Sequence, residues 1–135
     1  MKKLVVCLGI VLCFIAISPA CSKSDDGGCG EEAVNFTSTP AINSTEPPAP
    51  GPDFGLTVNV TGIPSSGVTI DVSAKPENPA SATAFYTETV TTTTASNDFI
   101  ITGTPLATSA IVTITVTSKS CTSNSKTGTY RYSRK

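Results

Sequence analysis

Three segments of this chain alternate strictly between apolar residues and polar, mostly hydroxyl-bearing ones. They cover residues 56–61, 68–73 and 112–117, which read LTVNVT, VTIDVS and VTITVT. A period of two places the apolar side chains on one face of a β-strand and the polar ones on the other. Their β-branched residues also suit a pleated, half-buried surface. These segments therefore predict strands with one face in a core and one face in water.

Weaker patterns extend this prediction to about seven strands. The additional strands are expected at 33–38, 82–90, 98–103 and 127–133. Clusters of glycine, proline, serine and asparagine between the strands have turn chemistry and lie at 62–67, 75–79, 95–97 and 103–105. About seven short strands in about a hundred residues are typical of an antiparallel β-sandwich.

The strand rhythm, above all over residues 103–133, resembles that of immunoglobulin-like and fibronectin-type-III-like modules. The resemblance implies one all-β sandwich over residues 31–135, with recognition loops at its ends. The proline-rich stretch at 39–53 is either the end of a tether or a loop within this domain. Val34 and Phe36, just upstream, favour the loop.

The first twenty residues have the organisation of a secretory signal. Two lysines precede an apolar stretch over 4–17, which is shorter than the roughly twenty residues of a membrane-spanning helix. Ser18-Pro19-Ala20 and then Cys21 follow. This order resembles a bacterial lipoprotein signal. The resemblance implies a signal-peptide helix over 1–20 that is removed on export, and attachment of lipid, palmitate included, to Cys21.

Residues 21–30 are expected to form a lipidated, flexible tether. The run SKSDDGG after Cys21 resembles the surface-export tag of lipoproteins from the Bacteroidota. That resemblance implies display on the outer face of the outer membrane. Read only as a polar spacer, the same run also fits a domain that faces the periplasm.

Cys29 and Cys121 are the cysteines that remain once the leader is removed and Cys21 carries lipid. The oxidising environment of an exported chain favours their pairing, and two free thiols are the alternative. A disulfide would tie the start of the domain to the end of its penultimate strand. In the chain-entropy model, closing so long a loop stabilises the fold by roughly 4–5 kcal/mol.

Catalytic and nucleic-acid functions find little support in the composition. The chain has no histidine, which removes the usual general base and the commonest metal ligand. Its carboxylates are sparse and unpaired, and no glycine-rich phosphate loop is present. Without Lys2 and Lys3, seven basic residues stand against ten acidic ones, with no clustered basic face. We expect no enzymatic activity, no cofactor, no metal site and no nucleic-acid partner.

Two features are candidates for ligand contact. Tyr130 and Tyr132 share one side of the last expected strand, with Arg131 opposite. An exposed pair can stack against a sugar ring, whereas a buried pair would cover the sandwich edge. Threonines at 113, 115 and 117 form a row that can align hydroxyls for a sugar or an ice lattice. Threonine is, however, also a favoured residue on the wet face of a strand.

Together these features predict a lipid-anchored, surface-exposed, non-enzymatic binding or adhesion module. Its recognition loops are expected around Pro64, Pro76 and Ala95. One alternative is an accessory subunit of an outer-membrane nutrient-uptake assembly, docked through an exposed strand edge. Another is an inhibitor of secreted hydrolases that acts through one loop.

Overall fold

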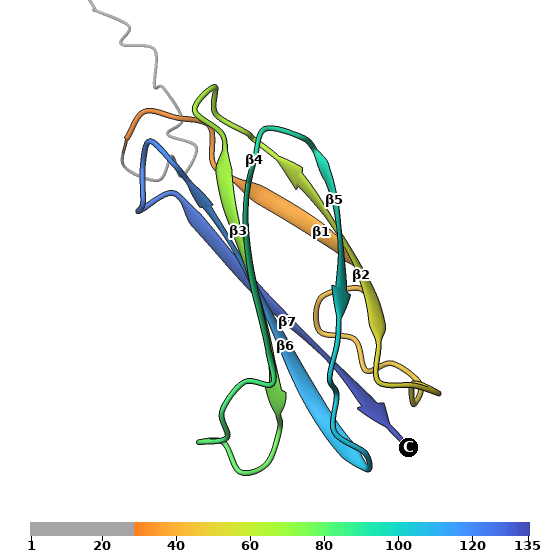
Figure 1. Cartoon of the computed structure of the whole chain (residues 1–135). Helices are drawn as coiled ribbons and strands as arrows, with labels where there is room; N and C mark the ends of the chain where they lie inside the picture. Colours follow the sequence, from red (N-terminus) through yellow and green to blue (C-terminus); the bar gives the residue numbers. More distant parts are fainter. Residues whose placement is uncertain (1–28) are drawn as a thin grey trace, which may run out of the picture.

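The computed structural model describes residues 29–135, which form two packed antiparallel sheets (Figure 1). The predicted signal peptide, the lipidation site Cys21 and the tether up to residue 28 lie outside the described residues. The strands are β1 (Asn35–Thr39), β2 (Phe54–Thr61), β3 (Val68–Pro76), β4 (Tyr86–Thr92), β5 (Ser96–Ile101), β6 (Thr108–Ser118) and β7 (Ser125–Arg134). One sheet has the order β1-β2-β5 and the other β4-β3-β6-β7. The fold class is the predicted one, an all-β, immunoglobulin-like sandwich.

The core lies between the two sheets and is built from the alternating segments. Val58 in β2, Ile70 in β3 and Ile114 in β6 are each 0% exposed, and the residues beside them in each strand face outward. Burying a side chain of this size stabilises the fold by about 1.5–3 kcal/mol relative to leaving it in water. The register predicted from the period of two is therefore confirmed in these strands.

The proline-rich segment connects β1 with β2 and runs beside the outer edge of β7. Asn43, Glu46 and Ala49 donate backbone hydrogen bonds to carbonyls of β7 at 2.7, 2.8 and 2.7 Å. The donors recur every third residue, as expected of an extended, polyproline-like chain, while Pro47 and Pro48 between them have no N–H to offer. The segment thus covers an edge that would otherwise expose unpaired backbone groups.

The turn between β4 and β5 lies earlier in the chain than the sequence suggests. Residues 95–97 were expected as a turn, but Ser96 and Asn97 already belong to β5. The Asn97 amide donates to the Thr94 carbonyl at 3.0 Å, and the Thr94 hydroxyl donates to the Asn97 side-chain oxygen at 3.1 Å. Asn97 therefore makes its contacts with the turn from within β5, and β4 continues to Thr92.

Within residues 29–135 no helix is long and apolar enough to cross a bilayer.

Candidate functional site

The incoming chain is fastened to the turn between β6 and β7 by a group of contacts that we call the N-terminal clasp. It comprises Cys29, Glu31, Ser118, Cys121 and Asn124. Cys29 and Cys121 form the expected disulfide, with Cα atoms 6.0 Å apart, a usual spacing for such a bond. The bond links residues 92 positions apart and holds the start of the domain at one end of the sandwich.

Asn124 is the buried centre of the clasp. Its side-chain oxygen accepts the backbone N–H of Val34 at 2.8 Å, and its amide donates to the Glu32 carbonyl at 2.9 Å. Only 3% of the residue is exposed, so each of these groups would be costly to leave unpaired. Sequence reasoning missed Asn124, because an asparagine in a serine-rich turn looks like ordinary turn chemistry.

Glu31 adds a charged contact to the same turn. Hydrogen bonds from the Ser120 and Ser118 hydroxyls hold the pKa of this carboxyl below its ordinary value. The Ser118 bond measures 2.7 Å, and the Asn124 amide lies 3.2 Å from the same carboxyl oxygen. The ionised carboxylate is thus the form that the clasp favours.

The tyrosine pair lies in the core. Tyr130 is 0% exposed and Tyr132 is 1% exposed, so of the two alternatives the pair is the buried one, and its candidate role in ligand contact is wrong. Tyr132 stacks on Phe54 with ring centroids 4.2 Å apart and shares a 2.5 Å hydrogen bond with the Thr104 hydroxyl. Burial raises the pKa of both phenols. Neither ring offers a face to a sugar.

Tyr130 and Tyr132 are buried because their rings fill the space between the two sheets. The chain has no tryptophan, and its core strands carry mainly valine, isoleucine and alanine. Tyr130, Tyr132 and Phe54 supply the bulk that these smaller side chains leave missing. Arg131 points to solvent between the two tyrosines, and this alternation was the signal in the sequence for an inward-facing pair.

The three loops proposed for recognition lie at opposite ends of the sandwich (Figure 1). The turn at Pro64 sits beside the clasp, since the Lys119 N–H donates to the Gly67 carbonyl at 3.1 Å. The turn at Ala95 lies at the same end, where the Val60 N–H donates to the Ala95 carbonyl at 2.7 Å. Of the three, only the loop after Pro76 lies at the end away from the clasp.

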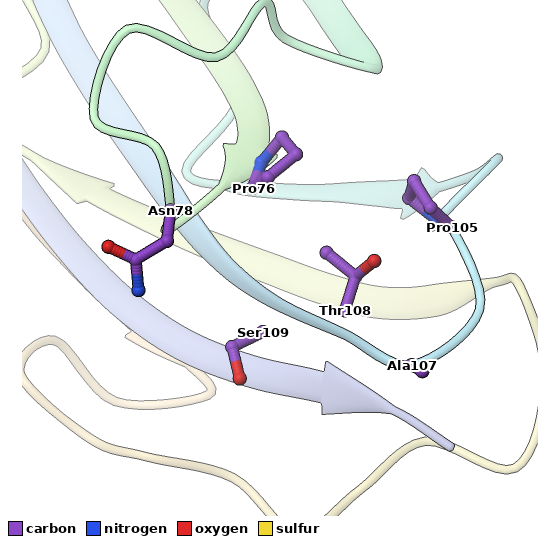
Figure 2. A pocket seen from close by; sticks show the side chains of 6 residues that line it. All are labelled: Pro76, Asn78, Pro105, Ala107, Thr108 and Ser109. Atoms are coloured by element: carbon purple, nitrogen blue, oxygen red, sulfur yellow. The ribbon is translucent and has the colours of Figure 1, made fainter.

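That far end holds an open pocket between the β3–β4 and β5–β6 loops, with a volume of about 380 Å³ (Figure 2). In the view of Figure 2, the Thr108 side chain points upward between Pro76 and Pro105, while the Asn78 and Ser109 side chains point downward. Ala107 completes the lining.

No lining side chain is charged. The pyrrolidine rings offer apolar surface, and the amide and hydroxyls offer hydrogen bonds, so the pocket suits a small neutral ligand. Leu106 beside it is 68% exposed.

The described residues also include side chains of the kinds that can bind a metal ion. Among residues 29–135, no group of three or more histidine, cysteine, aspartate or glutamate residues is placed to hold a metal ion. No protein-family model and no curated protein matches the chain. The functional assignment therefore depends on the chain's own geometry, chiefly on the contrast between the clasp and the far end.

Proposed function

We propose that the chain is a lipid-anchored, non-enzymatic binding module, displayed at the outer face of the outer membrane. The observation that carries this proposal is the position of the clasp and the pocket at opposite ends of one sandwich. A lipid on Cys21 would lie a few residues before Cys29, within a reach of at most about 30 Å. The membrane would then lie beyond the clasp, and the pocket would face away from it.

The far end has the properties of a recognition surface. Its loops come from the β3–β4 and β5–β6 connections, and it combines an uncharged pocket with an exposed leucine. The scaffold below it is a stapled, well-packed sandwich, which can hold such loops in place. A module of this form binds a ligand by shape and neutral hydrogen bonding.

Anchoring is tested by labelling cells with a radioactive fatty acid. The wild-type protein should carry label, and Cys21→Ser should lose it. Cys29→Ser is the matched control, because it also removes one cysteine near the N-terminus but should remain labelled. Protease treatment of intact cells then tests display: a domain cleaved only after lysis would contradict the surface position.

Ligand binding at the far end is tested with the full-length protein in detergent on an array of mono- and disaccharides. Thr108→Arg fills the pocket with a charged side chain, and Thr122→Arg introduces the same side chain at the exposed clasp end. Thr108→Arg should abolish array binding while Thr122→Arg retains it. Equal binding by the two variants would remove the pocket from the proposal.

One observation favours a second function, that of an accessory subunit in an outer-membrane assembly. The edge of β7 is covered by the proline-rich segment, whereas β4, at the other edge of that sheet, pairs only with β3 in the described part. A partner strand could add to β4 through its free backbone groups. Mild cross-linking followed by co-purification with a barrel protein would support this function, and a monomeric protein after cross-linking would oppose it.

A further inference from the structure

The outer face of the four-stranded sheet carries an array of hydroxyl groups, which we call the hydroxyl face. It consists of every second residue over 87–91, 69–73, 113–117 and 125–129, in strands β4, β3, β6 and β7. The register aligns them in three rows of four, one of which is Thr91, Thr69, Thr117 and Ser125. Nine of the twelve are threonine and two are serine, and Asp71 is the single charged residue. All are exposed or half-exposed.

Threonine preference alone does not explain this distribution. The chain has 22 threonines, and nine of them fall on these twelve positions. The outer face of the three-stranded sheet also faces water, yet its rows mix threonine with Asn59, Gly55 and Ile100. A general demand for polar residues on wet strands would act on both faces alike. The concentration of hydroxyls is therefore a property of one face.

Neighbouring hydroxyls on this face orient one another. Thr115 and Thr127 share a hydrogen bond of 3.0 Å, and so do Thr117 and Ser125. The Thr89 hydroxyl donates to the Asp71 carboxylate at 2.6 Å. A hydroxyl has one donor and two acceptor lone pairs, so each paired group keeps capacity for a ligand. The sheet thus holds partly oriented hydroxyls at spacings of about 4.8 Å across strands and about 6.6 Å along them.

We propose that the hydroxyl face binds a neutral polysaccharide chain. Sugar hydroxyls are donors and acceptors that match those of threonine, and the threonine methyl groups offer apolar contact to the C–H groups of a sugar ring. The lone carboxylate of Asp71 disfavours an acidic polymer. Many weak contacts along one repeating chain add to a useful affinity. The inference extends the proposed binding function to a second surface, separate from the pocket.

The shape of the sheet selects a flexible chain over an ice lattice. Adjacent strands are rotated by roughly 20–25° relative to one another, so four strands cannot present their hydroxyls in one plane. A crystal plane is rigid and would match only part of such a face. A polysaccharide can follow the twist by rotating about its glycosidic bonds.

The test is sedimentation of the full-length protein in detergent with non-crystalline neutral polymers, namely acid-swollen cellulose, colloidal chitin, gelatinised starch and cross-linked dextran, and, as an acidic polymer, calcium alginate. Thr113→Val/Thr115→Val/Thr117→Val removes three central hydroxyls and keeps the β-branched shape. Thr37→Val/Thr39→Val/Thr61→Val is the matched control on the outer face of the other sheet. Circular dichroism confirms that both variants are folded.

At least one neutral polymer should retain the wild-type protein, and the β6 triple variant should bind about tenfold more weakly. The control triple variant should bind like wild type. Retention by alginate alone, by none of the polymers, or equally by both triple variants would overturn the inference. Loss of binding in Thr108→Arg would assign the polysaccharide to the pocket instead. Fatty-acid labelling and surface display are measured separately, so their failure would affect only the proposed function.

Discussion

The two ends of this sandwich differ in the contacts that hold their loops. At the clasp end, the disulfide, a buried asparagine and a carboxylate tie the incoming chain to the β6–β7 turn. At the far end, the loops after β3 and β5 surround an open pocket, and Leu106 is exposed. Ala107 there has a φ of 53°, a left-handed backbone that alanine rarely adopts.

The difference shows where this small domain places its constraints. A domain of this size buries only about 60–65% of the surface of its unfolded chain, so additional fastening matters for its stability. The covalent bond and the buried asparagine lie where the chain enters the sandwich at Cys29. The loops at the opposite end are held by hydrogen bonds, such as that from the Glu77 N–H to the Ser109 carbonyl at 2.8 Å, and by the exposed Arg131–Glu77 ion pair, which contributes little to stability. Variants at the two ends should therefore differ sharply in their effect on stability.

The largest effect is expected from removing the disulfide. Cys29→Ala/Cys121→Ala should lower the free energy of unfolding by about 4 kcal/mol, because a loop of 92 residues is no longer closed in the unfolded chain. Urea unfolding of the variant and of wild type, each with and without reductant, measures the loss. Reductant should lower the unfolding midpoint of wild type to that of the variant and leave the midpoint of the variant unchanged. Equal midpoints for oxidised and reduced wild type would show that the clasp does not depend on the bond.

A matched pair of asparagines sharpens the comparison. Asn124→Ala should cost about 2–3 kcal/mol, since the Val34 N–H and the Glu32 carbonyl lose their partner in a buried site. Asn78→Ala, in the exposed lining of the pocket, should change stability by no more than about 0.5 kcal/mol. Chemical denaturation measures both changes. A similar loss in the two variants would mean that the ends do not differ in their constraints.

The sequence predicted the sandwich because its signal is local. In β2, β3 and β6 the alternation alone places the core residues, and Cys29 with Cys121 could be paired by elimination once the leader was set aside. The strand predicted at 82–90 begins four residues too early and ends two residues too early relative to β4 (Tyr86–Thr92), because its threonines and Glu88 carry no apolar alternation. In β7 the alternation of Tyr130 and Tyr132 with Arg131 separates the two sides of the strand, and the charge of Arg131 indicates that the tyrosine side is the buried one.

The candidate surfaces were less accessible to prediction, because they join residues distant in sequence. The pocket combines Pro76 and Asn78 with Pro105 and residues 107–109, and only the packing of two loops brings them together. The row of threonines in β6 was visible in the sequence, whereas its extension over four strands required the register. Asn124 has partners some ninety positions away, so nothing near it in the sequence indicates its role.

Acid should weaken the clasp through Glu31. Its pKa is lowered in the folded protein by the Ser120 and Ser118 hydroxyls, so its contribution is present above its ordinary pKa of 4.5 and is lost as the pH falls through the folded value. Wild type should therefore lose more stability than Glu31→Gln on acidification below about pH 4.5. Urea midpoints across this range measure the difference. Parallel pH profiles for the two proteins would mean that the carboxylate does not contribute.

The smallest effect is expected at the far end, from relief of the backbone at Ala107. A left-handed conformation costs a non-glycine residue roughly 1–2 kcal/mol, and a glycine at position 107 avoids this cost. Glycine also has more conformational freedom in the unfolded chain, and the loss of this freedom on folding cancels about half of the stabilisation. Ala107→Gly should thus raise the free energy of unfolding by about 0.5 kcal/mol, and Ala107→Val should lower it by more than about 1 kcal/mol. Thermal melts of the two variants measure the sign. If Ala107→Gly instead destabilises the domain, the far-end loop is held more tightly than its open pocket indicates, and the contrast with the clasp narrows.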